Sequence, residues 1–164
     1  MGLVDRVTKE DIDDNEELYR NVRGEEDADE YQIDRNTGRL RFTSQAFLDR
    51  KTTPSVDRAK LRNYEPRLSL ISDSNGIASL IAEEVRSIGN VKSKDDKGKE
   101  IHHAVDVLHD PNPPEDREND AHSLIIVDPK FLSSDKQGKA FKLMRKALAI
   151  LATKRGWTLD PTDK

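Results

Sequence analysis

The stretch "IHHAVDVLHDPNPPEDRENDAHSLIIV", residues 101–127, decides the fold. It contains two apolar segments, 101–108 and 123–127, in which Val, Ile and Leu favour β-strands. A polar, proline-rich segment separates them, and such segments form surface loops. If the two strands pair as antiparallel neighbours, the segment between them brings its own two ends together. We therefore expect an antiparallel sheet and a long surface loop at 110–121.

A second antiparallel pair is predicted at residues 31–42, "YQIDRNTGRLRF". Apolar and polar residues alternate on both sides of the turn at 36–38, whose Asn and Gly tolerate a positive φ. This pattern predicts a β-hairpin with one buried face.

A long amphipathic helix is predicted at about 134–155. Its apolar residues recur at helical spacing and share one face: Phe141, Met144, Leu148 and Leu151. Ser133 or Ser134 is expected to cap the helix, and Gly156 is expected to end it. Ser55 is expected to cap a shorter helix that runs to Leu61.

Strands and helices in this order predict an α+β fold with a small antiparallel sheet, in a single domain that spans 1–164. The charged ends, 1–16 and 159–164, are expected to be mobile. The polar residues 92–100 predict a second long surface loop.

The composition is polar: 34% of the residues are hydrophobic and 37% are charged. A modest core with extensive solvated loops follows from these values. The chain has no cysteine, which excludes disulfides and thiolate zinc sites and fits a reducing cytoplasm. No apolar run approaches the ~18 residues of a membrane span. We therefore expect a cytoplasmic protein with no membrane contact.

The net charge of −4 is unevenly distributed. Residues 1–30 contain twelve acidic and four basic residues, whereas residues 130–164 contain three acidic and nine basic residues. This polarity predicts either pairing between the two ends or a charged partner.

All four histidines lie in the opening stretch, which raises the question of a metal site. His109 ends the first predicted strand and His122 begins the second, so pairing would bring the two within a few ångströms, beside Asp110 and Asp120. Two imidazoles and a carboxylate can bind zinc or iron. The alternative is that these histidines hydrogen-bond loop carbonyls, and the long connection and the absence of an HExxH motif favour it. We expect no metal and no cofactor.

Two Asp-Arg pairs, Asp49-Arg50 and Asp57-Arg58, each follow a serine by a few residues. Such a pair can bind an anion or orient a carboxylate of a partner. The alternative, which we favour, is a self-contained turn in which Asp57 accepts hydrogen bonds from backbone N–H groups.

Several catalytic and binding motifs are absent from the sequence. There is no G-x-S-x-G elbow and no Walker or G-x-G-x-x-G loop, which argues against acyl transfer and standard nucleotide binding. The predicted C-terminal helix carries Lys142, Arg145 and Lys146, which could contact phosphates or an acidic partner. Nucleic-acid binding is the weaker alternative, because aromatic residues make up only 5% of the chain.

Three pieces of the sequence resemble a group of short, mostly uncharacterised bacterial proteins: "LYR" at 18–20, "SQAF" with "PSVDRA" between 44 and 59, and "DPNP" with "AH" between 110 and 122. In that group N-P-A-H is compact, whereas here "PEDREND" separates Pro113 from Ala121. The resemblance implies a small component of a multi-gene bacterial system concerned with biological conflict or defence, and implies no activity.

"LYR", "TSQAF" and a later glutamate are also similar to the Arg-Ser-Glu layout of ADP-ribosyltransferases. That resemblance implies that Arg20 would bind a dinucleotide and that Ser44 would lie at the dinucleotide site. Glu83, Glu84 and Glu100 are then equal candidates for the glutamate.

The sequence therefore predicts a non-enzymatic interaction module, an accessory or regulatory subunit whose partner is another protein encoded nearby. Its partner surface would use Asp57, Arg58, Lys142, Arg145 and Lys146. The alternative is an enzyme, either metal-dependent through His109 and His122 or an ADP-ribosyltransferase through Arg20 and Ser44. Nucleic-acid binding through the basic helix is the third hypothesis.

Overall fold

The computed structural model describes residues 9–49, 53–111, 119–131 and 138–162. Its elements in chain order are β1 (Glu17–Val22), η1 (Glu26–Ala28), β2 (Tyr31–Ile33), β3 (Leu40–Phe42), η2 (Ser44–Phe47), β4 (Ser55–Arg58), η3 (Ala59–Arg62), η4 (Pro66–Ser69), β5 (Gly76–Ile81), α1 (Ala82–Arg86), β6 (Lys92–Lys94), β7 (Glu100–His102), β8 (Ala104–His109), β9 (His122–Asp128), α2 (Gly138–Arg155) and β10 (Trp157–Leu159), where η marks a 3-10 helix.

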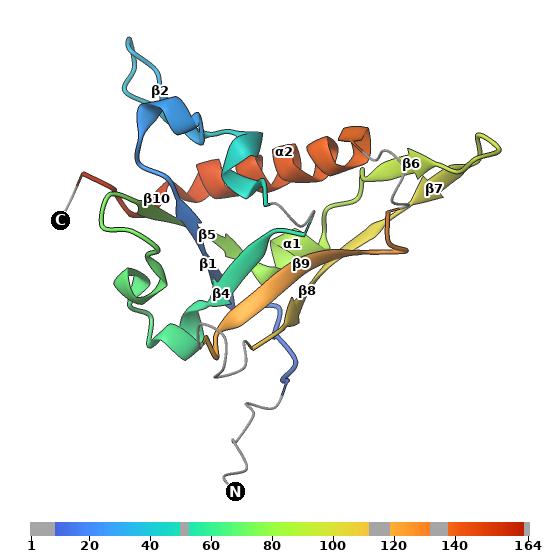
Figure 1. Ribbon diagram of the computed structural model, residues 1–164, viewed down its shortest axis with the longest axis horizontal. Helices are drawn as coiled ribbons and strands as arrows, with labels where there is room; N and C mark the ends of the chain where they lie inside the picture. The colour runs from blue at the N-terminus through green and yellow to red at the C-terminus, as the bar shows by residue number, and fades with distance from the viewer. Residues whose placement is uncertain (1–8, 50–52, 112–118, 132–137, 163–164) are drawn as a thin grey trace, which may run out of the picture.

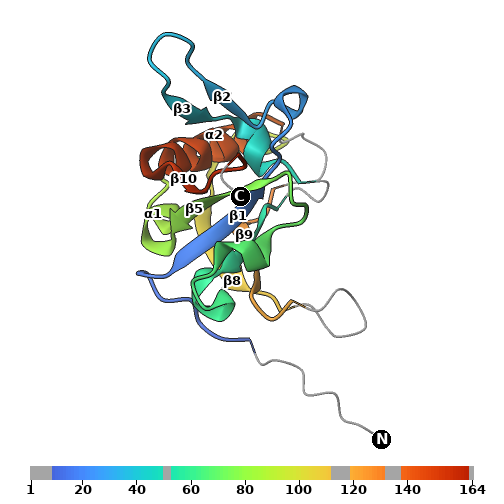
Figure 2. The ribbon, with the colours of Figure 1, turned by 90° about the vertical axis from the view of Figure 1, so that its left-hand side faces the viewer.

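Six strands form one antiparallel sheet in the order β10-β5-β1-β4-β9-β8 (Figure 1). The helix α2 covers one face of this sheet, and α1 packs against β5 and β8 (Figure 2). In the part of the chain that the structure describes, the other face is bordered by the short helices η3 and η4. The predicted α+β fold is thus confirmed.

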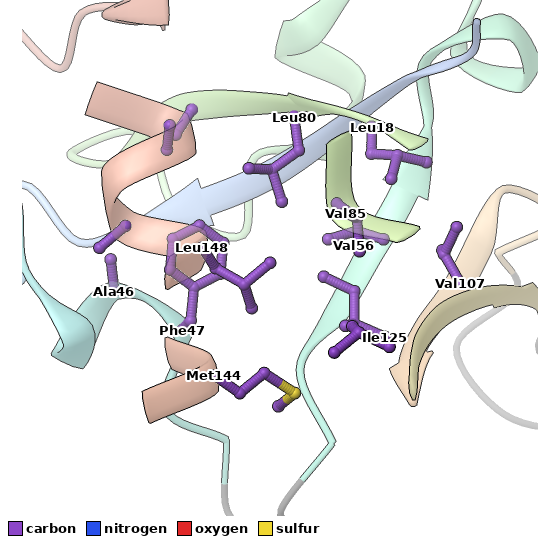
Figure 3. Packing of buried hydrophobic residues seen from close by; sticks show 14 of the residues in the cluster. Leu18, Ala46, Phe47, Val56, Leu80, Val85, Val107, Ile125, Met144 and Leu148 are labelled. Carbon is purple, nitrogen blue, oxygen red and sulfur yellow. The ribbon is translucent and has the colours of Figure 1, made fainter. Parts of the chain in front are cut away.

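The core lies between the sheet and the two helices (Figure 3). Leu18 and Val56 come from neighbouring strands of the sheet, and Phe47, Met144 and Leu148 pack over them from η2 and α2. Burial of these side chains supplies the main favourable contribution to folding.

The strands predicted in the opening stretch are β8 and β9, and they pair antiparallel. Val105 lies opposite Val127, and Val107 lies opposite Ile125, so alternate residues of both strands face the core. The residues before Ala104 belong to a separate hairpin, β6–β7, which replaces the surface loop expected at 92–100. Its turn is stabilised by the Asp95 carboxylate, which accepts hydrogen bonds from two backbone N–H groups.

The hairpin predicted at 31–42 is β2–β3, which projects from the body of the protein (Figure 1). Its base is packed, because Tyr31 and Phe42 make edge-to-face contacts with Trp157. Its tip is not, since Ile33 is 51% exposed. The expected buried face therefore exists only at the base of the hairpin.

The helix α2 confirms the long C-terminal helix as far as the structure describes it, from Gly138 onward; its predicted start at 133–134 lies outside the described residues. Met144 and Leu148 are fully buried, as the apolar stripe predicted. Gly156 ends the helix at a φ of 74°, a left-handed conformation that disfavours side chains with a Cβ atom.

Two local predictions differ from the structure. Residues 55–58 form the strand β4 and not a helix, because Val56 alternates with polar neighbours and faces the core. The first described residues are anchored to the sheet, since Glu10 and Glu16 both bind Arg58. At the other end, Trp157–Leu159 add an edge strand to the sheet.

Among the described residues no helix has the length and apolarity needed to cross a membrane.

Candidate functional site

The face of the sheet opposite α2 contains a wide polar groove. Register places Ser79, Tyr19, Asp57 and His122 in one row across β5, β1, β4 and β9, all on this face. A hollow of about 950 Å³ extends along the row and under η3 and η4. We call it the open-face groove; its lining includes Tyr19, Leu48, Asp57, Arg62, Leu68, Ile71, Asn119 and His122.

Asp57 organises one end of the groove. Its carboxylate accepts hydrogen bonds from Ser69 Oγ at 2.6 Å and from Asn119 Nδ2 at 2.8 Å, and it lies 3.5 Å from Arg62 Nε. Arg62 Nη2 in turn donates to Asn119 Oδ1 at 2.5 Å. Asp57 therefore binds side chains of three other segments, where backbone N–H groups were expected. These contacts hold η3, η4 and residue 119 against the sheet.

His122 presents one free ring nitrogen to the groove. Its Nδ1 donates to the backbone oxygen of Asp110 at 2.8 Å, because a carbonyl can only accept, and lies 3.5 Å from the Asp110 carboxylate. Within the described residues Nε2 has no hydrogen-bond partner. The hydrogen bond from Nδ1 thus fixes the orientation of the imidazole and leaves Nε2 available to a ligand.

Tyr19 lies two strands from His122 and is almost completely buried. Burial raises the pKa of Tyr19 to about 12, and the negative charges of Glu17 and Glu65 add to this effect. Its hydroxyl makes no hydrogen bond to any residue that the structure describes. Tyr19 therefore remains a neutral hydrogen-bond donor over the whole physiological range.

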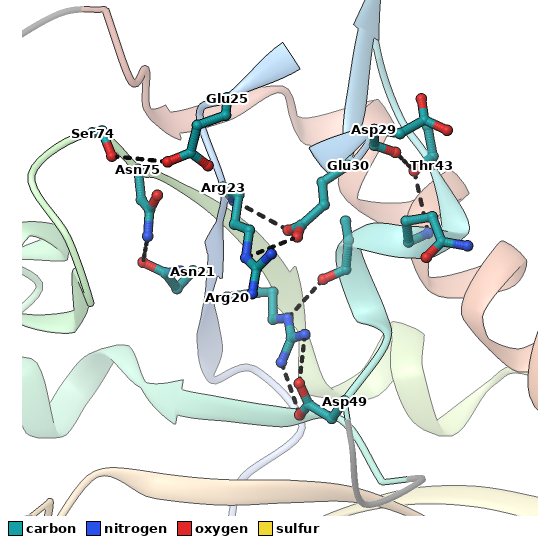
Figure 4. A network of polar contacts seen from close by, with 12 residues as sticks. Arg20, Asn21, Arg23, Glu25, Asp29, Glu30, Thr43, Asp49, Ser74 and Asn75 are labelled. Atoms are coloured by element: carbon teal, nitrogen blue, oxygen red, sulfur yellow. Dashed lines mark hydrogen bonds and ion pairs between the residues drawn. The ribbon is translucent and has the colours of Figure 1, made fainter. Parts of the chain in front are cut away.

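Arg20 and Asp49 also line the hollow, although strand alternation places the Arg20 side chain on the α2 side of the sheet. Figure 4 shows the contact between the two residues. The guanidinium of Arg20 binds both carboxylate oxygens of Asp49, at 2.9 and 3.1 Å, and the backbone oxygens of Ala46 and Ser55, both at 2.8 Å. Burial alone would raise the pKa of Asp49, but the hydrogen bonds and charge of Arg20 outweigh burial and lower it.

These contacts use four of the five N–H donors of Arg20, which leaves little for a dinucleotide phosphate. Ser44 begins η2 and is half-buried. The three candidate glutamates lie elsewhere, Glu83 and Glu84 on α1 and Glu100 on β7. Among the described residues, Arg20 binds Ala46, Asp49 and Ser55 and none of these glutamates, so the structure does not assemble the Arg-Ser-Glu site.

His109 points away from the groove, and this corrects the expectation that His109 and His122 adjoin. His109 lies opposite Ser123, one residue from His122, so the two imidazoles are on opposite faces of the sheet. Its Nδ1 accepts the N–H of Glu10 at 3.0 Å and its Nε2 donates to the backbone oxygen of Asp120 at 2.6 Å. Both ring nitrogens of His109 are therefore used within the chain.

The remaining histidines are also bound within the chain. His103 is buried between Ser93 Oγ and the backbone oxygen of Pro129, and His102 lies beside Glu100 on an exposed strand. Among the described residues, no three His, Cys, Asp or Glu side chains are grouped so that they could hold a metal ion.

The residues predicted to bind a partner occupy three different environments. Arg58 is 1% exposed, and its guanidinium binds Glu16 twice, at 2.8 and 2.9 Å, and Glu10 at 2.8 Å, so it is not part of a surface. Asp57 lies in the groove. Lys142 and Lys146 are exposed on α2. Their predicted companion, Arg145, lies partly inside the protein.

Arg145 has no hydrogen-bond partner for its buried Nε and Nη1 atoms in the part of the chain that the structure describes. Burial lowers its pKa. Arg50, the other member of a predicted Asp-Arg pair, lies outside the described residues.

Sequence reasoning did not find Arg62, Asn119, Leu68 or Ile71, which line the groove. Their residue types follow no motif, and their position depends on how η3, η4 and residue 119 pack on the sheet. The pieces "LYR", "PSVDRA" and "AH", however, contribute Tyr19, Asp57 and His122 to this one groove.

No family model matches the chain, and no curated protein and no solved structure was found to be similar to it.

Proposed function

We propose that this protein is a non-enzymatic interaction module that binds a segment of another protein in the open-face groove. The observation that carries this proposal is the groove's combination of a polar floor with an apolar rim. Eight large apolar side chains are exposed among the described residues, and Leu48, Leu68 and Ile71, three of them, line the groove. Exposed apolar side chains gathered around one hollow are typical of protein interaction sites.

The groove is more suitable for a polypeptide than for a small cofactor. Small-molecule sites are usually enclosed and mostly apolar, with a few polar groups that fix orientation. Here the floor is polar and open, and its acidic side chains are already paired with Arg20, Arg23 and Arg62. The hydroxyl of Tyr19 can donate to a carbonyl or side-chain oxygen of a polypeptide, and the free Nε2 of His122 can accept one of its N–H groups.

The interaction partner is proposed to be a protein encoded near this one, with this chain as an accessory subunit of a bacterial, defence-related system. That part of the proposal depends on the resemblance of "LYR", "SQAF", "PSVDRA" and "AH" to small bacterial proteins. Acidic residues are concentrated near the start of the chain and basic residues near its end, and the lysines of α2 are exposed. Both observations agree with a role in assembly.

The test is co-elution of the purified protein with the products of its neighbouring genes. Leu68→Asp and Ile71→Asp each place a charge on the rim of the groove and should weaken association at least tenfold. Tyr64→Asp is the matched control, because Tyr64 is 65% exposed but does not line the groove. Association that is equally strong in all variants, or no association with any neighbour, would contradict the proposal.

A second candidate function is acid–base catalysis at His122, which the oriented ring and free Nε2 favour. An activity that is lost in His122→Gln while Leu68→Asp keeps it would support catalysis over partner binding. Nucleic-acid binding, the third hypothesis, requires salt-dependent retention on DNA or RNA that Lys142→Glu and Lys146→Glu weaken.

A further inference from the structure

The outer side of α2 carries an apolar stripe that the core does not use. Leu143, Ala147 and Ile150 recur at spacings of four and three residues, so they share one side of the helix. Leu143 is 38% and Ile150 is 60% exposed, although both are large apolar side chains.

A hollow of about 430 Å³ lies beside this stripe, between α1 and α2. Its α2 wall consists of Ala147, Ile150 and Leu151, and Ile88, just beyond α1, forms the opposite apolar wall. We call the stripe and this hollow the α1–α2 face. The face therefore has a ridge, Leu143 and Ile150, next to a depression of matching apolar character.

Opposite charges flank the α1–α2 face. Glu83 and Glu84 of α1 line the hollow on one side. Lys139 and Lys146 are exposed on α2, seven residues apart and thus in line along the helix. At 100° per residue they lie beyond the ridge, on the side of the stripe away from Leu151 and α1.

We propose that the α1–α2 face binds a second copy of this chain, with the two α2 helices side by side and parallel about a twofold axis. In this arrangement the ridge of each copy enters the hollow of the other. The lysines of each copy then meet Glu83 and Glu84 of the other. An antiparallel pair of α2 helices would instead place glutamates against glutamates, which is unfavourable.

The surface complements itself both in shape and in charge, which is the requirement for an isologous twofold contact. A partner of other chemistry would need to supply both charge signs in the same arrangement. The hollow of the α1–α2 face and the open-face groove share no lining residue. The dimer therefore leaves both grooves open and does not depend on the proposed function.

Sedimentation equilibrium of the full-length protein over a range of concentrations tests the dimer. The unmodified protein should show a reversible monomer–dimer equilibrium, and Ile150→Asp should raise the dimer dissociation constant at least tenfold. Ile33→Asp is the matched control, since Ile33 is similarly exposed on the projecting hairpin and should leave the dissociation constant unchanged.

Charge reversal tests whether the molecule that binds the α1–α2 face is a second copy of this chain or a different molecule. Glu83→Lys with Glu84→Lys should weaken the dimer, and addition of Lys139→Glu with Lys146→Glu to the same chain should restore it. Circular dichroism confirms that each variant is folded. A protein that is monomeric up to millimolar concentration, a dimer insensitive to Ile150→Asp, or a charge swap that does not restore dimerisation would overturn the proposal.

Discussion

His109 and His122 approach the same connection from the paired strands β8 and β9, yet their imidazoles lie on opposite faces of the sheet. His109 is opposite Ser123, and this offset by one residue directs it into the protein, where both of its ring nitrogens are hydrogen-bonded. His122 faces the open-face groove with one nitrogen free. One histidine therefore stabilises the fold, and the other is available to a ligand.

The two histidines should respond differently to truncation. His109→Ala removes a side chain that is only 2% exposed and takes away the partner of both the Glu10 N–H and the Asp120 carbonyl, which should cost about 2–4 kcal/mol of the free energy of unfolding. His122→Ala should cost under about 1 kcal/mol. Urea denaturation of both variants measures the difference, and equal losses would contradict the assignment of their roles.

Arg58 should be one of the most sensitive positions in the chain. Arg58→Met leaves the carboxylate of Glu16 buried without its partner, and loss of one member of a buried ion pair costs about 3–5 kcal/mol. The double variant Arg58→Met with Glu16→Leu removes both charges and should recover much of this loss. A double variant less stable than Arg58→Met alone would show that the ion pair is not the cause.

Stability should fall on the acid side of neutrality. Burial alone would raise the pKa of Glu16, but the hydrogen bonds from Arg58 and the Asp13 N–H outweigh it and lower the pKa. A carboxyl with a lowered pKa in the folded protein stabilises above its unfolded pKa of about 4.3 and loses that contribution as the pH falls. Denaturation midpoints should therefore decrease from pH 6 towards pH 3. The decrease should be shallower in Glu16→Gln.

Arg145 is expected to behave in the opposite way to Arg58. Its buried Nε and Nη1 atoms have no partner among the described residues, and burial lowers its pKa. Arg145→Met keeps the apolar stem, removes the desolvated charge and should leave the protein unchanged or up to about 2 kcal/mol more stable. Thermal and urea denaturation measure this, and a clear loss of stability would reveal a partner for Arg145.

Local sequence patterns predicted the helices and strands of this protein well where apolar residues recurred at a clear spacing. The apolar alternation of β8 and β9, the turn of the β2–β3 hairpin and the stripe of α2 were all evident, because each depends on neighbours within a few residues. The pattern was ambiguous at residues 55–61 and 92–100. There a short strand and a polar hairpin were interpreted as a helix and a loop, since few residues carried the signal.

The sequence by itself determined the α+β class, the strand pairing next to the long connection and the helix ending at Gly156, since periodicity and turn chemistry are local properties. Only the tertiary structure decided the register that separates His109 from His122, and it alone joined Tyr19, Asp57 and His122 in one groove. Those relationships depend on side-chain packing between segments far apart in the chain, and a shift of one residue in a strand reverses which face a side chain occupies.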